Sequence, residues 1–96
     1  MSNYLILIRV GGTGTKLSQL SKSLQNITKT PTQGVKVIGT WTTFGQYDAS
    51  VLFQAEAESQ AMDFVDAQIR ILQGVLSTET LMVTPQANYT PGASSN

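Results

Sequence analysis

The chain is 96 residues long and electrically balanced, with six Lys or Arg residues against six Asp or Glu residues. It has neither Cys nor His, which excludes disulfides, thiolate nucleophiles, metal sites built on these residues and the commonest acid–base side chain near neutral pH. The charges are scattered singly, so nothing resembles the basic stripe of a nucleic-acid-binding protein. We therefore expect no cofactor and no nucleic-acid partner.

Length and local composition predict one small domain followed by a tail. A chain of this length buries only roughly 60–65% of its unfolded surface, so we expect a thin core. We assign residues 1–84 to the domain, whereas residues 85–96 are mostly Pro, Gln, Asn, Gly and Ser and are expected to form a flexible C-terminal tail. The longest apolar stretch, residues 4–8, is far too short to span a membrane, and residues 1–3 are no signal peptide. We expect a soluble, cytoplasmic protein without a membrane partner.

The first part of the chain predicts a strand and a helix. Residues 4–10 are apolar on both faces apart from Arg9, which is typical of a central strand. Over residues 15–29, apolar side chains recur at spacings of three and four, at Leu17, Leu20, Leu24 and Ile27. This pattern predicts an amphipathic helix with Thr13 or Thr15 as its N-cap.

The rest of the chain predicts a hairpin, a second helix and a last strand. Residues 35–43 and 47–54 are rich in β-branched and aromatic residues and flank Gly45, which suits the positive φ of a tight turn. Residues 60–73 carry a second apolar stripe, and residues 75–83 are again typical of a strand. The order β-α-β-β-α-β predicts an α+β, ferredoxin-like fold, in which two helices cover one face of a four-stranded antiparallel sheet.

Side-chain alternation assigns each strand residue to the helix-packed face or to the opposite, open face. We assign the more apolar set of each strand to the helices, which places Trp41 and Tyr47 in the core. The open face then mixes aliphatic and polar residues, namely Leu5, Leu7, Ile38, Leu52 and Leu81 with Arg9, Lys36, Thr40, Thr42, Asp48, Ser50, Gln54 and Glu79. That mixture is too apolar for water and too charged for a dry core. We therefore predict a homo-oligomer, at least a dimer, in which the open faces of two copies meet.

The segment T-W-T-T-F-G-Q-Y-D, residues 40–48, resembles the signature of the GYD-domain family, whose name reflects Gly45, Tyr47 and Asp48. The resemblance extends over residues 4–83. It implies a ferredoxin-like subunit that forms a dimeric α/β barrel, similar to a superfamily with Lrp/AsnC ligand-binding domains, muconolactone isomerases and cofactor-free monooxygenases. The family has no settled biochemical function, and the first helix region here is shorter than usual and has no Arg-rich segment where its members often carry basic residues.

The candidate site residues come from the open face. Those expected to bind a small-molecule ligand are Arg9, Lys36, Thr40, Asp48, Ser50 and Glu79. Asp48 is also the candidate catalytic residue, as a general base; alternatively, it caps backbone amides after the hairpin turn. Arg9 and Glu79 are expected to form an ion pair within or across the dimer. Residues 11–16, G-G-T-G-T-K, lack the Gly-Lys-Ser/Thr order of a phosphate-binding loop, so we interpret them as an ordinary turn.

Three classes of function stay open at this point. The first is a small-molecule-binding or assembly module. The second is a cofactor-independent isomerase or monooxygenase-like enzyme that uses Asp48 and Arg9, and the third is a ligand-sensing regulatory domain. We favour the first, because the absence of His weakens the second and the absence of DNA-binding helices weakens the third.

Overall fold

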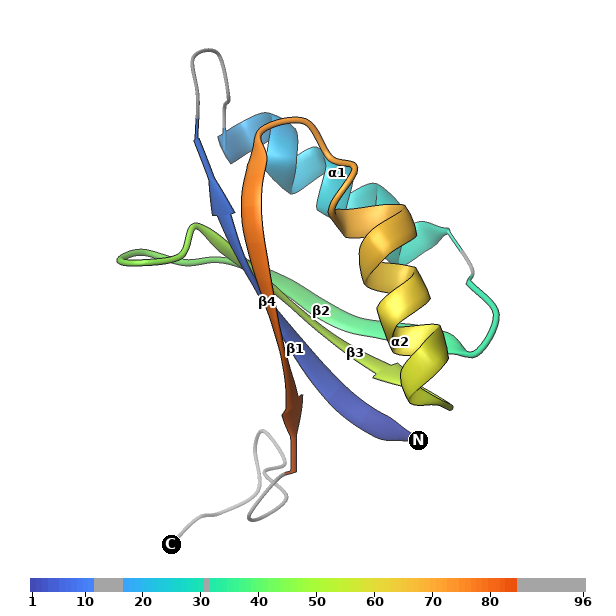
Figure 1. The fold of residues 1–96 in the computed structure, drawn as a ribbon. Coiled ribbons are helices and arrows are strands. Elements are labelled where there is room, and N and C mark those ends of the chain that lie inside the picture. Colours follow the sequence, from blue (N-terminus) through green and yellow to red (C-terminus); the bar gives the residue numbers. More distant parts are fainter. Residues whose placement is uncertain (12–16, 31, 85–96) are drawn as a thin grey trace, which may run out of the picture.

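A computed structural model of the chain describes residues 1–11, 17–30 and 32–84. In chain order, its elements are β1 (Ser2–Val10), α1 (Leu17–Lys29), β2 (Val35–Thr42), β3 (Ala49–Ala55), α2 (Glu58–Phe64), the π-helix η1 (Val65–Ile69) and β4 (Val75–Val83). The strands form one antiparallel sheet in the order β2-β3-β1-β4, and the helices cover the same face of it (Figure 1). The predicted ferredoxin-like fold is confirmed.

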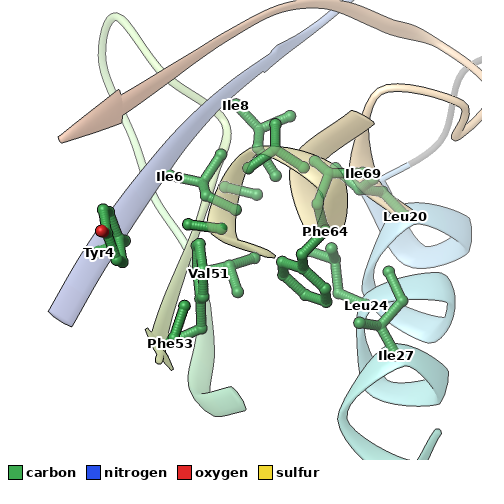
Figure 2. Close-up of a cluster of buried hydrophobic side chains, with 14 residues drawn as sticks. Tyr4, Ile6, Ile8, Leu20, Leu24, Ile27, Val51, Phe53, Phe64 and Ile69 are labelled. Atoms are coloured by element: carbon green, nitrogen blue, oxygen red, sulfur yellow. The ribbon is translucent and has the colours of Figure 1, made fainter. Parts of the chain in front are cut away.

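The core lies between the helices and the sheet face that they cover (Figure 2). Its buried members are Tyr4, Ile6 and Ile8 of β1, Ala49, Val51, Phe53 and Ala55 of β3, Leu20, Leu24 and Ile27 of α1, and Ala61, Phe64, Val65 and Ile69 of α2 and η1. At its centre, the ring of Phe53 stacks on Tyr4 with centroids 5.3 Å apart and meets Phe64 at 4.8 Å. Alternation therefore assigned the helix-packed residues of β1 and β3 correctly.

The second helix differs from the uninterrupted helix predicted over residues 60–73. α2 begins at Glu58 and gives way after Phe64 to η1, where the Arg70 N–H donates to the carbonyl of Val65 at 2.9 Å. A bond of this spacing defines a π-helix, whose wider turn an apolar stripe does not reveal. The predicted caps at Thr13 or Thr15, most of the 11–16 turn and the 85–96 tail lie outside the described residues.

The hairpin between β2 and β3 projects beyond the body of the sheet (Figure 1). Its base is closed by Thr43, whose N–H donates to the carbonyl of Asp48 at 3.0 Å and whose hydroxyl donates to the carbonyl of Tyr47 at 2.9 Å. Gly45 has a φ of 111°, the positive value predicted for this turn. The neighbouring side chain of Phe44 is 95% exposed.

A β-bulge in β2 determines which way the second half of this strand faces. Val37 pairs with Phe53, but the next residue of β3, Leu52, pairs with Gly39 rather than with Ile38. Because cross-strand partners share a face, the extra residue reverses the alternation beyond it. Gly39 and all later residues of β2 therefore lie on the face opposite to the one predicted.

Candidate functional site

The open face of the sheet, which the helices leave uncovered, is organised in three cross-strand rows. Read from β2 through β3 and β1 to β4, they are Trp41–Ser50–Leu7–Glu79, Gly39–Leu52–Leu5–Leu81 and Lys36–Gln54–Asn3–Val83. Arg9 lies beyond the first row, where it pairs with Ser77 of β4. The face therefore has an apolar middle row between two rows that carry polar and charged groups.

The apolar part of this face is not fully shielded within one chain. Leu5, Leu7 and Leu52 are half-buried, and Leu81 is 39% exposed. The polar side chain of Ser50, by contrast, is buried at 6% exposure and lies between Trp41 and Leu7 in its row. Soluble monomers rarely expose contiguous apolar surface of this kind, and such a surface usually marks an interaction site.

The assignments of Gly39, Thr40, Trp41 and Thr42 from alternation are wrong because of the bulge, and two of them concern the candidate site. Trp41, expected in the core, is 50% exposed and pairs with Ser50 on the open face. Thr40, expected among the open-face ligand residues, pairs with the fully buried Val51 and so lies on the helix-covered face. A glycine inside a strand pattern, here Gly39, was the available signal, because such glycines mark bulges and close approaches.

Tyr47 was also expected in the core, but it contacts β4 across the open face. Its hydroxyl donates a hydrogen bond of 2.6 Å to Oε2 of Glu79. This bond raises the pKa of Tyr47 above its ordinary value of 10.0; desolvation and the charge of Glu79 act in the same direction, and the charge of Arg9 opposes them.

The predicted Arg9–Glu79 ion pair is not formed within one chain. The described residues contain a single ion pair, Arg70–Asp66.

Asp48 caps the backbone where the hairpin meets β1. Its Oδ2 accepts a hydrogen bond of 2.9 Å from the N–H of Val10, and its own N–H donates to the carbonyl of Ile8 at 2.8 Å. The two bonds extend the contact between β3 and β1 by one residue. This is the capping role that the sequence analysis offered as the alternative to a general base.

The structure thus brings together only part of the predicted site. Three candidate ligand residues are neighbours at one end of the open face: Arg9, Ser50 and Glu79. Asp48 lies next to them in the hairpin, and Lys36 lies two rows away on the same face. Two aromatic residues that the sequence analysis placed in the core join this face: Trp41 and Tyr47.

Hollows in the described surface adjoin the open face only at its margins, where one of about 300 Å³ includes Lys36 and one of about 190 Å³ includes Asn3 and Val83. One of about 240 Å³ follows one side of α2 and η1, and its lining residues are Thr32, Gln33, Gln60, Asp63, Phe64, Ala67 and Gln68. Another, of about 370 Å³, adjoins the start of β4 and is lined by Arg70, Val75, Leu76, Ser77 and Thr78. Neither includes Asp48 or Arg9.

The described ranges lack a membrane-spanning helix and a cluster of metal ligands. No helix among them is long and apolar enough to cross a membrane. Nor does this part of the chain gather three or more Asp, Glu, His or Cys side chains that could hold a metal ion. The open face is therefore the feature on which a functional interpretation can be built.

Comparison with known proteins gives structural relatives only. No protein-family model and no curated protein matches the sequence. TTHA0845 from Thermus thermophilus is 25% identical over 93% of this chain and 100% of its own, with a TM-score of 0.71. AsnC from E. coli is 17% identical over 92% of this chain and 54% of its own, with a TM-score of 0.66. The transcriptional regulator NMB0573 from Neisseria meningitidis, solved as an L-Met complex, is 14% identical over 97% of this chain and 56% of its own, with a TM-score of 0.74.

These likenesses show the ferredoxin-like fold. The chain spans about half the length of the regulators that it matches. Membership of the GYD-domain family is not shown, because no family model matches. The expectation of no nucleic-acid partner gains no support from neighbours that include transcriptional regulators.

Proposed function

We propose that the chain is a ligand-sensing regulatory domain that works as a homodimer through the open face of its sheet. From the sequence alone we favoured a simple binding or assembly module, whereas neighbours described as transcriptional regulators support the regulatory function. The observation that carries the proposal is the likeness to a regulator solved with L-Met, which extends over 97% of this chain. Fold alone does not determine function, so the proposal also needs a surface that suits it.

The open face supplies such a surface. Its middle row of Gly39, Leu52, Leu5 and Leu81 is apolar, and its three leucines are only partly shielded in one chain. Burying these side chains against a second copy stabilises the assembly by about 25 cal/mol for each Å² of apolar area removed from water. A two-fold axis brings identical rows together, which is the commonest arrangement of homodimers.

The polar ends of the same face favour a small ligand between the two sheets. The guanidinium of Arg9 and the carboxylate of Glu79 offer charges of opposite sign and form no ion pair with each other within a chain. Groups arranged in this way suit a small molecule that carries both an acidic and a basic group. An enzymatic role for Asp48 is not part of the proposal, because its carboxylate is engaged by the backbone of Val10.

A thermal-shift titration with the standard amino acids, starting with L-Met, tests the ligand-sensing role. Binding to the folded state raises the unfolding midpoint by mass action. We expect at least one amino acid to raise it in a saturable way, and an Arg9→Gln variant to need a higher concentration for the same shift. An Arg70→Gln variant is the matched control, because Arg70 lies on the helix side in an exposed pair with Asp66. A midpoint that no amino acid moves would overturn the proposal.

A further inference from the structure

Trp41, the single tryptophan of the chain, lies back across Gly39 on the open face. A Cβ built on Gly39 would stand 2.8 Å from Cη2, 3.2 Å from Cζ2 and 3.4 Å from Cζ3 of the indole. Real Cβ atoms essentially never approach another atom to 2.8 Å, so the indole keeps this position only because residue 39 has no side chain. The outer atoms of the six-membered ring thus lie close over the backbone of Gly39, and the residue as a whole is 50% exposed.

Two features of β2 cooperate to put the indole there. The bulge at Ile38 turns Trp41 away from the core, and Gly39 then provides the space beneath the ring. Bulges often re-aim a side chain beside a functional site. In a chain this short, the core is small and large aromatic residues are expected to be buried in it. Trp41 departs from this pattern, and departures of this kind are concentrated at functional sites.

The surroundings of the indole indicate what it can bind. Leu52, the cross-strand partner of Gly39, and Leu5 beyond it continue the apolar row. Lys36 lies on the same face one row further on, exposed, and it has no ion pair among the described residues. An aromatic face beside an apolar floor and an unpaired ammonium group complements a flat ring that carries a negative charge.

We propose that Trp41, supported by Gly39, is a stacking platform for a planar aromatic ligand whose anionic group pairs with Lys36. The inference rests on the proposed function, because it names a ligand class for the same open face. It differs from it in the groups involved: Trp41 belongs to the row next to Arg9, but its indole reaches back over Gly39 in the apolar row, toward Lys36.

The fluorescence of the single tryptophan reports directly on this platform. The probe is benzoate, which has a planar ring and one negative charge. Cyclohexanecarboxylate supplies the charge without the planar ring, and benzamide supplies the ring without the charge. We expect a saturable change of Trp41 emission with benzoate, and at least a roughly fivefold weaker response to either control compound, since each lacks one of the two interactions.

Variants followed by calorimetry assign the binding to named residues. Trp41→Leu should weaken benzoate binding roughly tenfold, whereas Trp41→Phe, which keeps an aromatic ring, should retain part of the affinity. Lys36→Gln should weaken it about two- to fivefold, and Lys22→Gln, an exposed position on α1, should leave it unchanged. Gly39→Ala should weaken binding and also alter the Trp41 emission without any ligand, because its methyl group displaces the indole.

The outcomes separate this inference from the proposed function. If benzoate leaves the emission unchanged, or if Trp41→Leu binds benzoate as tightly as the wild type does, the platform is overturned, whatever the amino-acid titration gives. A third outcome is a dimer that does not bind benzoate and whose Trp41 emission is blue-shifted and not quenched by acrylamide. In that case Trp41 is covered by the second copy. That result overturns the platform while leaving the dimer intact.

Discussion

The carboxylate of Asp48, in the β2–β3 hairpin, accepts a hydrogen bond of 2.9 Å from the backbone N–H of Val10, the last residue of β1. The residue that looked most like a catalytic base from the sequence thus holds two segments of backbone together. Tyr47, immediately before it, contacts β4 through Glu79. The hairpin is therefore attached to its neighbour β1 and, beyond β1, to β4, and these two attachments can be tested separately.

Removal of the Asp48 carboxylate should cost stability. We expect Asp48→Ala to lower the free energy of unfolding by about 1–2 kcal/mol, because the partly buried N–H of Val10 loses its acceptor. Asp48→Asn should cost less, since its amide oxygen can still accept the bond. Urea denaturation measures both. Asp66→Ala is the control and should cost at most about 0.5 kcal/mol, because its ion pair with Arg70 is exposed. Equal costs for Asp48→Ala and Asp66→Ala would contradict the capping role.

The Tyr47–Glu79 hydrogen bond should appear in the alkaline titration of the protein. Its effect is a Tyr47 pKa above 10.0 in the folded state. In the unfolded chain the same phenol titrates near 10. Between these two values the folded state holds the proton and the unfolded state does not, so stability falls as the pH rises through this window.

NMR observation of the Tyr47 ring measures this titration directly. Glu79→Ala should lower the midpoint toward 10, because it removes both the hydrogen-bond acceptor and the charge that favour the protonated phenol. In Tyr47→Phe, the loss of stability above pH 10 should be shallower than in the wild type. An unchanged Tyr47 midpoint in Glu79→Ala would show that the hydrogen bond is not formed in solution.

The hairpin turn should require glycine at position 45. Gly45 has a φ of 111°, a conformation that side chains rarely adopt, although open space surrounds it. We expect Gly45→Ala to destabilise the protein by about 1–2 kcal/mol through backbone strain alone. Gln46→Ala, at the adjacent exposed position, should change stability by less than about 0.5 kcal/mol. Thermal unfolding compares the two, and a Gly45→Ala variant as stable as Gln46→Ala would argue for a different turn.

The fold could be predicted from the sequence because its local signals agree. The stripe of α1 and the alternation of β1 and β3 each point to the same core, and the register confirms the open-face assignment of Glu79 and Leu81 in β4. β2 is the exception. Its residues alternate as though Val35, Val37, Gly39 and Trp41 shared a face, but alternation counts residues and cannot detect the one that the bulge inserts at Ile38.

The candidate site was predicted less well for the same physical reason. Thr40 and Trp41 exchange faces because they follow the bulge, and Tyr47 has no assignable face because it lies before β3 begins. Residues on regular parts of the strands, such as Ser50 and Glu79, lie where alternation placed them. Hydrogen bonds between distant segments, such as Val10 to Asp48, follow from tertiary geometry that spacing along the chain does not encode.

The central claim is that the open face meets the same face of a second copy, and Leu81 allows a matched test of it. Leu81 lies on the open face opposite Leu5, whereas its neighbour Met82 pairs with Tyr4 on the other face and is 60% exposed. A lysine at position 81 would place a charge in the apolar row, so Leu81→Lys should separate the copies. Met82→Lys, with the same added charge on the same strand, should not.

Light scattering coupled to size-exclusion chromatography at micromolar concentration measures the mass of the particle and so tests whether two copies associate. For a chain of 10.3 kDa, we predict a particle of twice that mass for the wild type and Met82→Lys, and of 10.3 kDa for Leu81→Lys. A wild-type particle of 10.3 kDa, or a Leu81→Lys variant that keeps the doubled mass, would contradict the account.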